Sequence, residues 1–345
     1  MTAPRAEAQV PLALESPGKP PSRLLGQLSD AGQRYGLLLV WAITIGAFGA
    51  VEPSTFLTTA DFASIFGSNA VLFVLTLGLI IPMTSGDFDL SVAATLTLSS
   101  MLAAILNVND HWPIGAAIVV VLAMGALIGL VNGAIITFFG IDAIIVTLGV
   151  GSFLGGVTLW ISSANIVTGV SSTLVNWVVL NQLFSISLAF YYALAVCVAI
   201  WYLLEFTPVG RRLLIVGRDR NVARLSGLHV VRLRIGALMA AGMISAFAGV
   251  LSLGTSGAAD PTAPTALLLP AFAAAFLGAT TLIPGRFNPW GTFIAVYFLE
   301  TGISGFQILG VQSFVQDLFY GGALVVAVAL SQLARRRQEL RAGFG

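Results

Sequence analysis

The chain has 345 residues, of which 57% are hydrophobic and 9% are charged, and its formal net charge is +1. A soluble domain carries about 25% charged residues, and the mean hydropathy here is +0.95, so the solvent for most of this chain is lipid. This composition excludes a soluble enzyme, a nucleic-acid-binding protein and a secreted disulfide scaffold.

Residues 1–33 differ from the rest of the chain, because prolines interrupt a polar, alanine-rich stretch that lacks apolar periodicity. Such a composition predicts a disordered tail. The tail does not have the pattern of a secretory signal, since the first apolar run begins only at Tyr35. That run ends in Glu52-Pro53 without a small-residue cleavage site.

Ten apolar runs follow, each close to the roughly 20 residues that a helix needs to cross the hydrocarbon core. The runs are 35–51, 62–83, 90–107, 113–136, 141–162, 186–206, 233–254, 266–283, 289–309 and 314–333. Because they are continuously apolar rather than alternating, they favour helices over barrel strands. The sequence therefore predicts an all-α polytopic membrane protein with about ten transmembrane helices. Pro82 and Gly86 interrupt the pattern, and a broken or re-entrant helix near 82–92 would change that count.

All basic residues fall on one side of the membrane if ten spans are crossed from a cytoplasmic amino terminus. They are Arg5, Lys19, Arg23, Arg34, Arg211, Arg212, Arg218, Arg220, Arg224, Arg232, Arg234, Arg286, Arg335, Arg336, Arg337 and Arg341. Lys and Arg near span ends stay in the cytoplasm. We therefore expect a cytoplasmic tail at 1–33 and a membrane domain at 34–334 with a cytoplasmic loop at 207–234. A basic cytoplasmic tail at 335–345 follows.

Glycines repeat at four-residue spacing in two of the runs, at Gly125, Gly129 and Gly133 and again at Gly151 and Gly155. This spacing makes a flat helix face that another backbone can approach closely. Packing within the chain is the simpler explanation, and an interface between subunits is the alternative.

The side chains that catalysis and metal binding need are scarce. The two histidines, His111 and His229, belong to no metal-ligand cluster, and there is no nucleophile elbow. The single lysine, Lys19, lies between prolines and cannot belong to a phosphate-binding loop. We expect no catalytic residue, no metal and no ATP hydrolysis by this chain.

Four carboxylates lie near the ends of expected spans, with no basic partner inside the membrane: Asp142, Glu205, Glu300 and Asp317. Intramembrane ionisable residues often serve proton- or ion-driven carriers, so ion-coupled transport is one hypothesis. Interfacial carboxylates that reach headgroups or water are the other. A chain of acids and bases for proton relay is not visible.

Two further aspartates, Asp87 and Asp89, precede an apolar run. Carboxylates are favoured near helix amino termini, so capping of the next helix is expected of them. Direct contact with a solute or a partner protein is the alternative.

The hydrophilic stretch 207–234 contains the signals of a short helix. Asp219 suits the N-cap and Gly227 suits the left-handed residue that follows a helix. A helix of about seven residues is marginal in water, so it needs support from other parts of the protein. It is either a solvated basic loop or a docking helix for a cytoplasmic partner.

The segment Gly217–Leu228 resembles the cytoplasmic coupling loop of ribose-type ABC transporter permeases, in the superfamily shared with branched-chain amino-acid permeases. Three more segments resemble the family in the right order. They are Ser85–Val92; Gly129–Gly133 with Ile145–Gly149; and Phe276–Thr281 with Gly285-Arg286, Trp290–Thr292 and Gly310–Phe314. The family usually has small residues where Ile283-Pro284 and Phe287-Asn288 stand, so this hairpin is expected to bend differently.

The resemblance implies a permease subunit of a bacterial importer in the inner membrane, with a monosaccharide or related polyol as the solute. It implies a separate ATPase subunit that uses ATP, a periplasmic or lipid-anchored sugar-binding protein and a second, identical or paralogous permease chain. It implies no cofactor in this chain. A branched-chain amino-acid permease and an ion-coupled carrier remain the alternatives.

The resemblance also suggests which residues act. Contact with the ATPase is expected of Asp219, Arg220, Asn221, Arg224, Leu225, Ser226 and Gly227. Along the translocation pathway, a neutral polyhydroxylated solute needs hydroxyls, amides and aromatic faces. The candidates are Asn69, Asp87, Asp89, Asn132, Thr147, Trp160, Phe272 and Phe276, and packing is the alternative for each.

Overall fold

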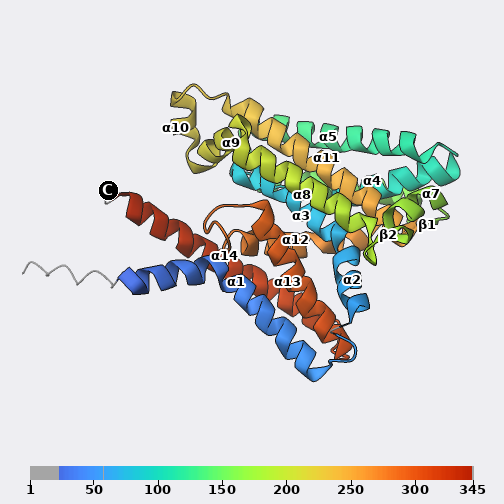
Figure 1. Cartoon of the computed structure of the whole chain (residues 1–345). Helices are drawn as coiled ribbons and strands as arrows, with labels where there is room; N and C mark the ends of the chain where they lie inside the picture. Colours follow the sequence, from blue (N-terminus) through green and yellow to red (C-terminus); the bar gives the residue numbers. More distant parts are fainter. Residues whose placement is uncertain (1–22, 57, 344–345) are drawn as a thin grey trace, which may run out of the picture.

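The computed structural model describes residues 23–56 and 58–343 (Figure 1). The α-helices are α1 Arg23–Val51, α2 Thr59–Ser68, α3 Ala70–Thr84, α4 Val92–Ala104, α5 Ile114–Phe138, α6 Ala143–Ser162, α7 Ser172–Val175, α8 Leu188–Phe206, α9 Pro208–Arg218, α10 Arg220–Leu225, α11 Val230–Ser256, α12 Leu268–Gly278, α13 Pro289–Ile308 and α14 Phe314–Gly343. Two π-helical turns, η1 Ile105–Asn109 and η2 Asn176–Leu180, and a 3₁₀ helix, η3 Ala263–Leu267, join them.

Four two-residue strands form two antiparallel pairs. Strand β1 Val167–Thr168 pairs with β4 Ala258–Ala259, so that Val167 lies opposite Ala259. Strand β2 Gln182–Leu183 pairs with β3 Ile186–Ser187 in a hairpin. Phe184 and Ser185 at its turn both have positive φ, which is the backbone of a type I′ hairpin.

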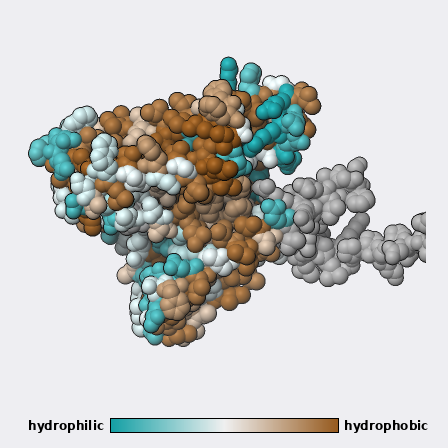
Figure 2. Space-filling view, turned by 180° about the vertical axis from the view of Figure 1, so that it is seen from behind, coloured by the Kyte–Doolittle hydropathy of each residue, from teal (hydrophilic) through white to brown (hydrophobic). Residues whose placement is uncertain are grey.

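The core of the described chain lies around α3 and α11. Every residue of α3 is buried, which is why its sequence is apolar all round rather than on one face. The surface helices α5 and α6 instead leave large apolar side chains exposed, such as Val119, Leu127 and Phe153. Figure 2 shows apolar residues over much of one face, with hydrophilic residues gathered towards its ends. A face of this kind is suited to lipid.

Glycines set the close approach of α5 to α11. A Cβ at Gly125 would clash with the carbonyl oxygen of Gly242, and one at Gly129 would clash with that of Leu238. Only glycine permits such backbone contact. Packing within the chain therefore explains Gly125 and Gly129. At Gly155 nothing lies within 4 Å.

The all-α, polytopic fold class is confirmed, but the count of ten spans is not. By length and apolar composition, seven helices of the described chain could cross a membrane, or eight if α2 and α3 form one bent span. The helix α12 has 11 residues, about 16 Å of helix, against a hydrocarbon core of about 30 Å. The bend of 42° falls between α2 and α3, at Asn69. Near 82–92 the chain instead forms a non-helical segment, 85–91.

The helices extend into both expected tails. Helix α1 begins at Arg23, inside the range 1–33 where the sequence predicts disorder, because its helical hydrogen bonding starts before the apolar run. Residues 1–22 of that range lie outside the described part. Helix α14 continues to Gly343 and includes most of the basic range 335–345.

Segments far apart in the sequence meet at one end of the molecule, which we call the basic end and define by residues 207–229 and 279–288. Arg286 there pairs with Glu205 at 3.0 Å, and the backbone N–H of Leu282 donates to the carbonyl of Arg34 at 3.0 Å. Both ends of the described chain lie on the same side (Figure 1). The β2–β3 hairpin marks the opposite end, the hairpin end.

Candidate functional site

At the basic end, the segment 207–229 folds into two short helices rather than a loop with one. Thr207 caps α9, since its hydroxyl accepts the backbone N–H of Gly210 at 3.4 Å, and Pro208 occupies the first turn. The carboxylate of Asp219 accepts the N–H groups of Asn221 at 2.7 Å and Val222 at 3.0 Å. The expected N-cap at Asp219 is therefore present.

The end of α10 also follows the sequence prediction. Gly227 has φ +77°, and its N–H donates to the carbonyl of Arg224 at 2.9 Å. The N–H of Leu228 donates to the carbonyl of Ala223 at 3.0 Å. These bonds occupy carbonyls that a helix end otherwise leaves free. The helix has six residues, Arg220–Leu225, close to the expected seven.

One face of α10 packs on its neighbours and the other faces outward. Ala223 is fully buried in a cluster with Val216 and Val230. Leu225 is 89% exposed and Val222 is 53% exposed. A short helix that presents apolar side chains outward beside arginines has the form of a docking surface.

The backbone of α9 lies against the segment 85–91, which joins α3 to α4. A Cβ at Gly217 would clash with the carbonyl oxygen of Thr84, and Gly86 has φ +80° with Gly217 close by. Glycine is required at both positions, at Gly217 for the contact and at Gly86 for the conformation.

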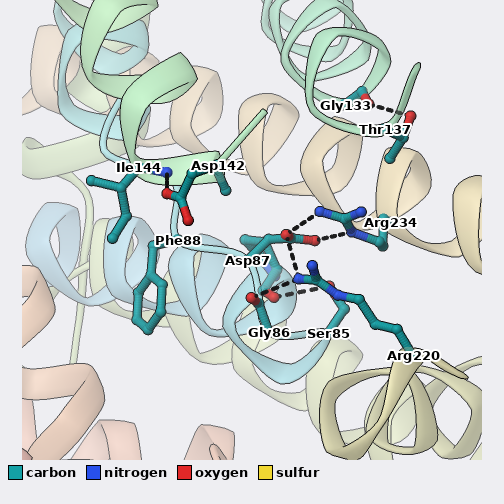
Figure 3. Close-up of polar contacts among 12 residues, drawn as sticks. Ser85, Gly86, Asp87, Phe88, Gly133, Thr137, Asp142, Ile144, Arg220 and Arg234 are labelled. Atoms are coloured by element: carbon teal, nitrogen blue, oxygen red, sulfur yellow. Dashed lines mark hydrogen bonds and ion pairs between the residues drawn. The ribbon is translucent and has the colours of Figure 1, made fainter. Parts of the chain in front are cut away.

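The centre of the site is Asp87, whose carboxylate binds two arginines (Figure 3). Arg234 of α11 donates from Nε to Oδ2 at 2.7 Å and from Nη2 to Oδ1 at 2.6 Å. Arg220 of α10 donates from Nη2 to Oδ1 of Asp87 and to the carbonyl of Gly86, both at 3.0 Å. The side chain of Asp87 is 1% exposed, that of Arg234 9% and that of Arg220 41%. We call these three residues the Asp87 cluster.

Burial strengthens the attraction between the charges of this cluster. Away from water, a two-pronged guanidinium–carboxylate pair holds a fixed geometry, and removal of one partner leaves an uncompensated buried charge. Asp87 therefore does not cap α4, which was one hypothesis from the sequence. It ties α10 and α11 to the segment 85–91.

The second aspartate does not cap α4 directly either, because α4 has no side-chain cap, but it holds the residue that precedes the helix. Asp89 is 1% exposed, and its Oδ1 accepts both the N–H of Ser91 at 2.9 Å and its hydroxyl at 2.6 Å, at the start of α4. Asn132 of α5 donates to the same Ser91 hydroxyl at 2.9 Å.

Burial raises the pKa of Asp89 from 3.8 to about 6, against the lowering effect of its Ser91 hydrogen bonds, and the charge of Asp87 raises it further. The folded chain thus holds this proton more tightly than the unfolded chain. The contribution of Asp89 to stability is complete below about pH 4 and is lost as the pH rises through about 6.

We expect Asp89→Asn to flatten the pH dependence of thermal unfolding of the purified chain across that interval. An unchanged profile in Asp89→Asn would assign the dependence to another group. Asp142→Asn is the control, because that carboxylate is exposed and caps α6 through the N–H of Ile144.

Six of the eight expected pathway residues gather around the segment 85–91. Besides Asp87, Asp89 and Asn132, Thr147 of α6 accepts the N–H of Leu90 at 3.0 Å. The ring of Phe88 lies 6.1 Å from that of Phe276 and 6.5 Å from that of Phe272, both of α12. These contacts hold the segment between α6 and α12.

The other two lie elsewhere. Asn69 lies at the bend between α2 and α3, and its side-chain amide donates to the carbonyl of Ile65 at 3.0 Å. Trp160 lies near the end of α6 and is 79% exposed.

The hairpin 279–288, where the sequence departs from the family pattern, is held by Asn288. Its Oδ1 accepts the N–H of Gly291, which caps α13, and its Nδ2 donates to the carbonyls of Gly278, Thr281 and Arg286 at 3.2–3.3 Å. Leu282 there has φ +57°. A single asparagine thus closes a turn whose backbone includes a non-glycine left-handed residue.

Two of the four carboxylates near span ends have side-chain partners that sequence alone did not predict. Glu205 pairs with Arg286 at the basic end, and Glu300 accepts the hydroxyl of Tyr320 at 2.6 Å. No group of three His, Cys, Asp or Glu side chains in the described residues is placed to hold a metal ion.

Arg234 is the site residue that sequence reasoning missed. In the sequence it belongs to the arginines of the stretch 207–234, which the preference of Lys and Arg for the cytoplasmic ends of spans explains. Only its position in α11, packed against Asp87, distinguishes it from the other arginines. The one signal present in the sequence was that Arg234 begins an apolar run, where a charge needs a partner.

Residues 62–328 match the family described as the permease component of branched-chain amino acid transport systems. The chain belongs to this permease family. The resemblance to the ribose-type permeases is confirmed by the relatives below, and the permease is a multi-pass membrane protein.

Relatives match the permease over nearly their whole length. It is 31% identical over 300 residues to the D-allose transport system permease protein AlsC of Escherichia coli (strain K12), a match that covers 87% of this chain and 92% of that protein. It is 32% identical over 301 residues to the ribose import permease protein RbsC of Bacillus subtilis (strain 168), covering 87% and 93%. It is 27% identical over 328 residues to the autoinducer 2 import system permease protein LsrD of Photorhabdus laumondii, covering 90% and 96%. No solved structure matches the chain.

Proposed function

We propose that this chain is the membrane-spanning permease subunit of a bacterial ABC importer that moves a monosaccharide or related polyol across the inner membrane. The names of its relatives, which are permeases for allose, ribose and autoinducer 2, support the solute class. Both termini and the basic end face the cytoplasm, in agreement with the inside location of arginines near span ends.

The observation that carries the proposal is the Asp87 cluster. It links α10, which has an exposed apolar and basic face, to a segment that contacts α5, α6, α11 and α12. A separate ATPase subunit binds that face and uses ATP, and this chain needs no cofactor. Leu225 enters a cleft of the ATPase, while Arg224 and Asn221 meet acidic groups or carbonyls at its edge.

Coupling follows from the contacts of α10. A displacement of α9 and α10 acts on the segment 85–91 through Arg220 and through the backbone contact of Gly217. That segment contacts α6 through Thr147 and α12 through Phe88, so the displacement reaches the membrane helices as a shift of packed elements. The free energy comes from the difference in ATPase contacts between the two states.

Two further partners complete the importer. A sugar-binding protein delivers the solute at the hairpin end, and a second permease chain, identical or paralogous, shares the pathway. The six clustered pathway candidates lie in or against the segment 85–91, where they respond to the coupling motion.

The test is uptake by the assembled importer. Cells that express this chain with its ATPase and binding protein should take up labelled D-ribose or D-allose, and uptake should stop when ATP is depleted. Leu225→Asp should abolish co-purification of the ATPase, because a carboxylate replaces the apolar contact. Val209→Asp, a change at an exposed apolar residue of α9, should leave co-purification intact.

The outcomes separate the alternatives. Uptake of labelled L-leucine but of neither sugar would favour a branched-chain amino-acid permease. Uptake that survives ATP depletion and collapses with the proton gradient would favour an ion-coupled carrier.

A further inference from the structure

A cavity of about 460 Å³ opens at the hairpin end, between α2, the β2–β3 hairpin and the last turn of α11. Seven of its eleven lining residues carry a hydroxyl or an amide, and none carries a charge. Thr59, Ser64 and Ser68 come from α2, Gln182 and Ser187 from the hairpin, and Thr255 from α11. The volume lies in the range of about 300–1,000 Å³ that small-molecule sites occupy.

The polar groups of this cavity have unused hydrogen-bonding capacity. The side chains of Ser64, Ser68 and Gln182 are exposed and have no hydrogen-bond partner among the described residues. They remain free to bind water or a solute.

The cavity lies beside the one bent helix pair of the described chain. Ser68, in its wall, precedes the 42° bend at Asn69. On the hairpin side, a Cβ at Gly67 would lie 2.8 Å from the hydroxyl of Ser187, so glycine lets α2 approach the hairpin. Solute sites in transporters commonly form at discontinuous helices, where the wall can move without the loss of a whole span.

We propose that this cavity receives the solute on the external side of the permease and that its ligand is a neutral polyhydroxylated molecule. The proposal rests on the proposed function, from which the external orientation follows. Hydroxyl and amide side chains can both donate to and accept from sugar hydroxyls. An amino acid would bring a carboxylate and an ammonium group into the cavity. No lining residue carries a charge that could pair with either of these groups.

The first test fills the cavity. Ala63 lines it, and Ala63→Phe should reduce uptake of labelled D-ribose and D-allose by the complete importer to background, with the ATPase still co-purifying. The matched control is Ala116→Phe, at an exposed position in the first turn of α5 at the same end of the molecule. That variant should transport as the unmodified chain does.

The second test does not depend on how a bulky residue is accommodated. The single natural cysteine, Cys197, is buried, so Ser64→Cys introduces the only accessible thiol of the described chain. The binding protein is present both with and without sugar. The sugar should slow the modification of the Ser64→Cys thiol by a membrane-impermeant maleimide severalfold. Asn165→Cys, outside the cavity at the same end, should react equally fast in both conditions.

The outcomes distinguish this proposal from the proposed function. If the unmodified importer takes up sugar, and Ala63→Phe transports normally or Ser64→Cys reacts equally fast with and without sugar, the cavity is not the solute site and the sugar-importer assignment stands. If the unmodified importer takes up L-leucine and neither sugar, the proposed function and this inference both fail.

Discussion

Asp87→Asn is expected to abolish uptake and to lower the free energy of unfolding by about 3–5 kcal/mol, because two arginines then face a neutral amide in a buried site. Arg234 loses both charged contacts, of 2.6 and 2.7 Å, and Arg220 loses one of 3.0 Å. Chemical unfolding of the purified chain and sugar uptake in cells measure the two effects.

Substitutions of the two arginines are expected to have different effects on stability and on uptake. Arg234→Gln should destabilise the chain about as much as Asp87→Asn, since the Arg234 side chain is 9% exposed. Arg220→Gln should destabilise it by no more than about 1 kcal/mol, because Arg220 is 41% exposed and surface pairs contribute little, yet it should impair uptake strongly. Normal uptake by Arg220→Gln would show that the Asp87 cluster has only a structural role.

Gly227→Val is expected to uncouple ATP hydrolysis from uptake. Gly227 has φ +77°, and an L-residue in the left-handed region costs about 1–2 kcal/mol, more for a β-branched side chain. The six-residue α10 has little intrinsic stability, so this cost disturbs the helix that we propose as the docking site for the ATPase. The measurement is sugar uptake per ATP hydrolysed by the reconstituted importer.

A second glycine provides the matched control. Gly140, between α5 and α6, has φ +68°, and a Cβ added there, like one added at Gly227, would meet no atom within 4 Å. Gly140→Val therefore introduces the same backbone strain in equally open space, outside the docking helix. It should keep the uptake-to-hydrolysis ratio of the unmodified chain, and equal losses in both variants would contradict a special role for α10.

Much of the basic end could be predicted from local sequence. A capping aspartate at 219 and a left-handed glycine at 227 act within a few residues of themselves, so their pattern alone located α10. The helix α9 was missed because its apolar run, Leu213–Val216, has only four residues and lies between arginines, whereas the spans were located by runs of about 20 residues.

The span count shows where sequence patterns are insufficient. Apolar runs located the helices, but whether a run forms one straight span depends on the packing of its neighbours. The run 62–83 bends at Asn69 and the run 266–283 yields only the short α12, because the turn 279–288 and η3 occupy its ends.

By itself, the sequence determined that this protein lies in lipid, that it is helical, which permease family it belongs to and where the short helix α10 is. The lipid environment, the helices and the position of α10 follow from composition, from periodicity and from caps that act locally, and the family follows from the resemblance of several ordered motifs. Only the tertiary structure decided that Asp87 binds Arg220 and Arg234, which are 133 and 147 residues away, and that uncharged side chains of α2, the hairpin and α11 surround one cavity. Such contacts depend on how separate helices pack, and no pattern within one segment specifies the partner that a buried charge finds in another.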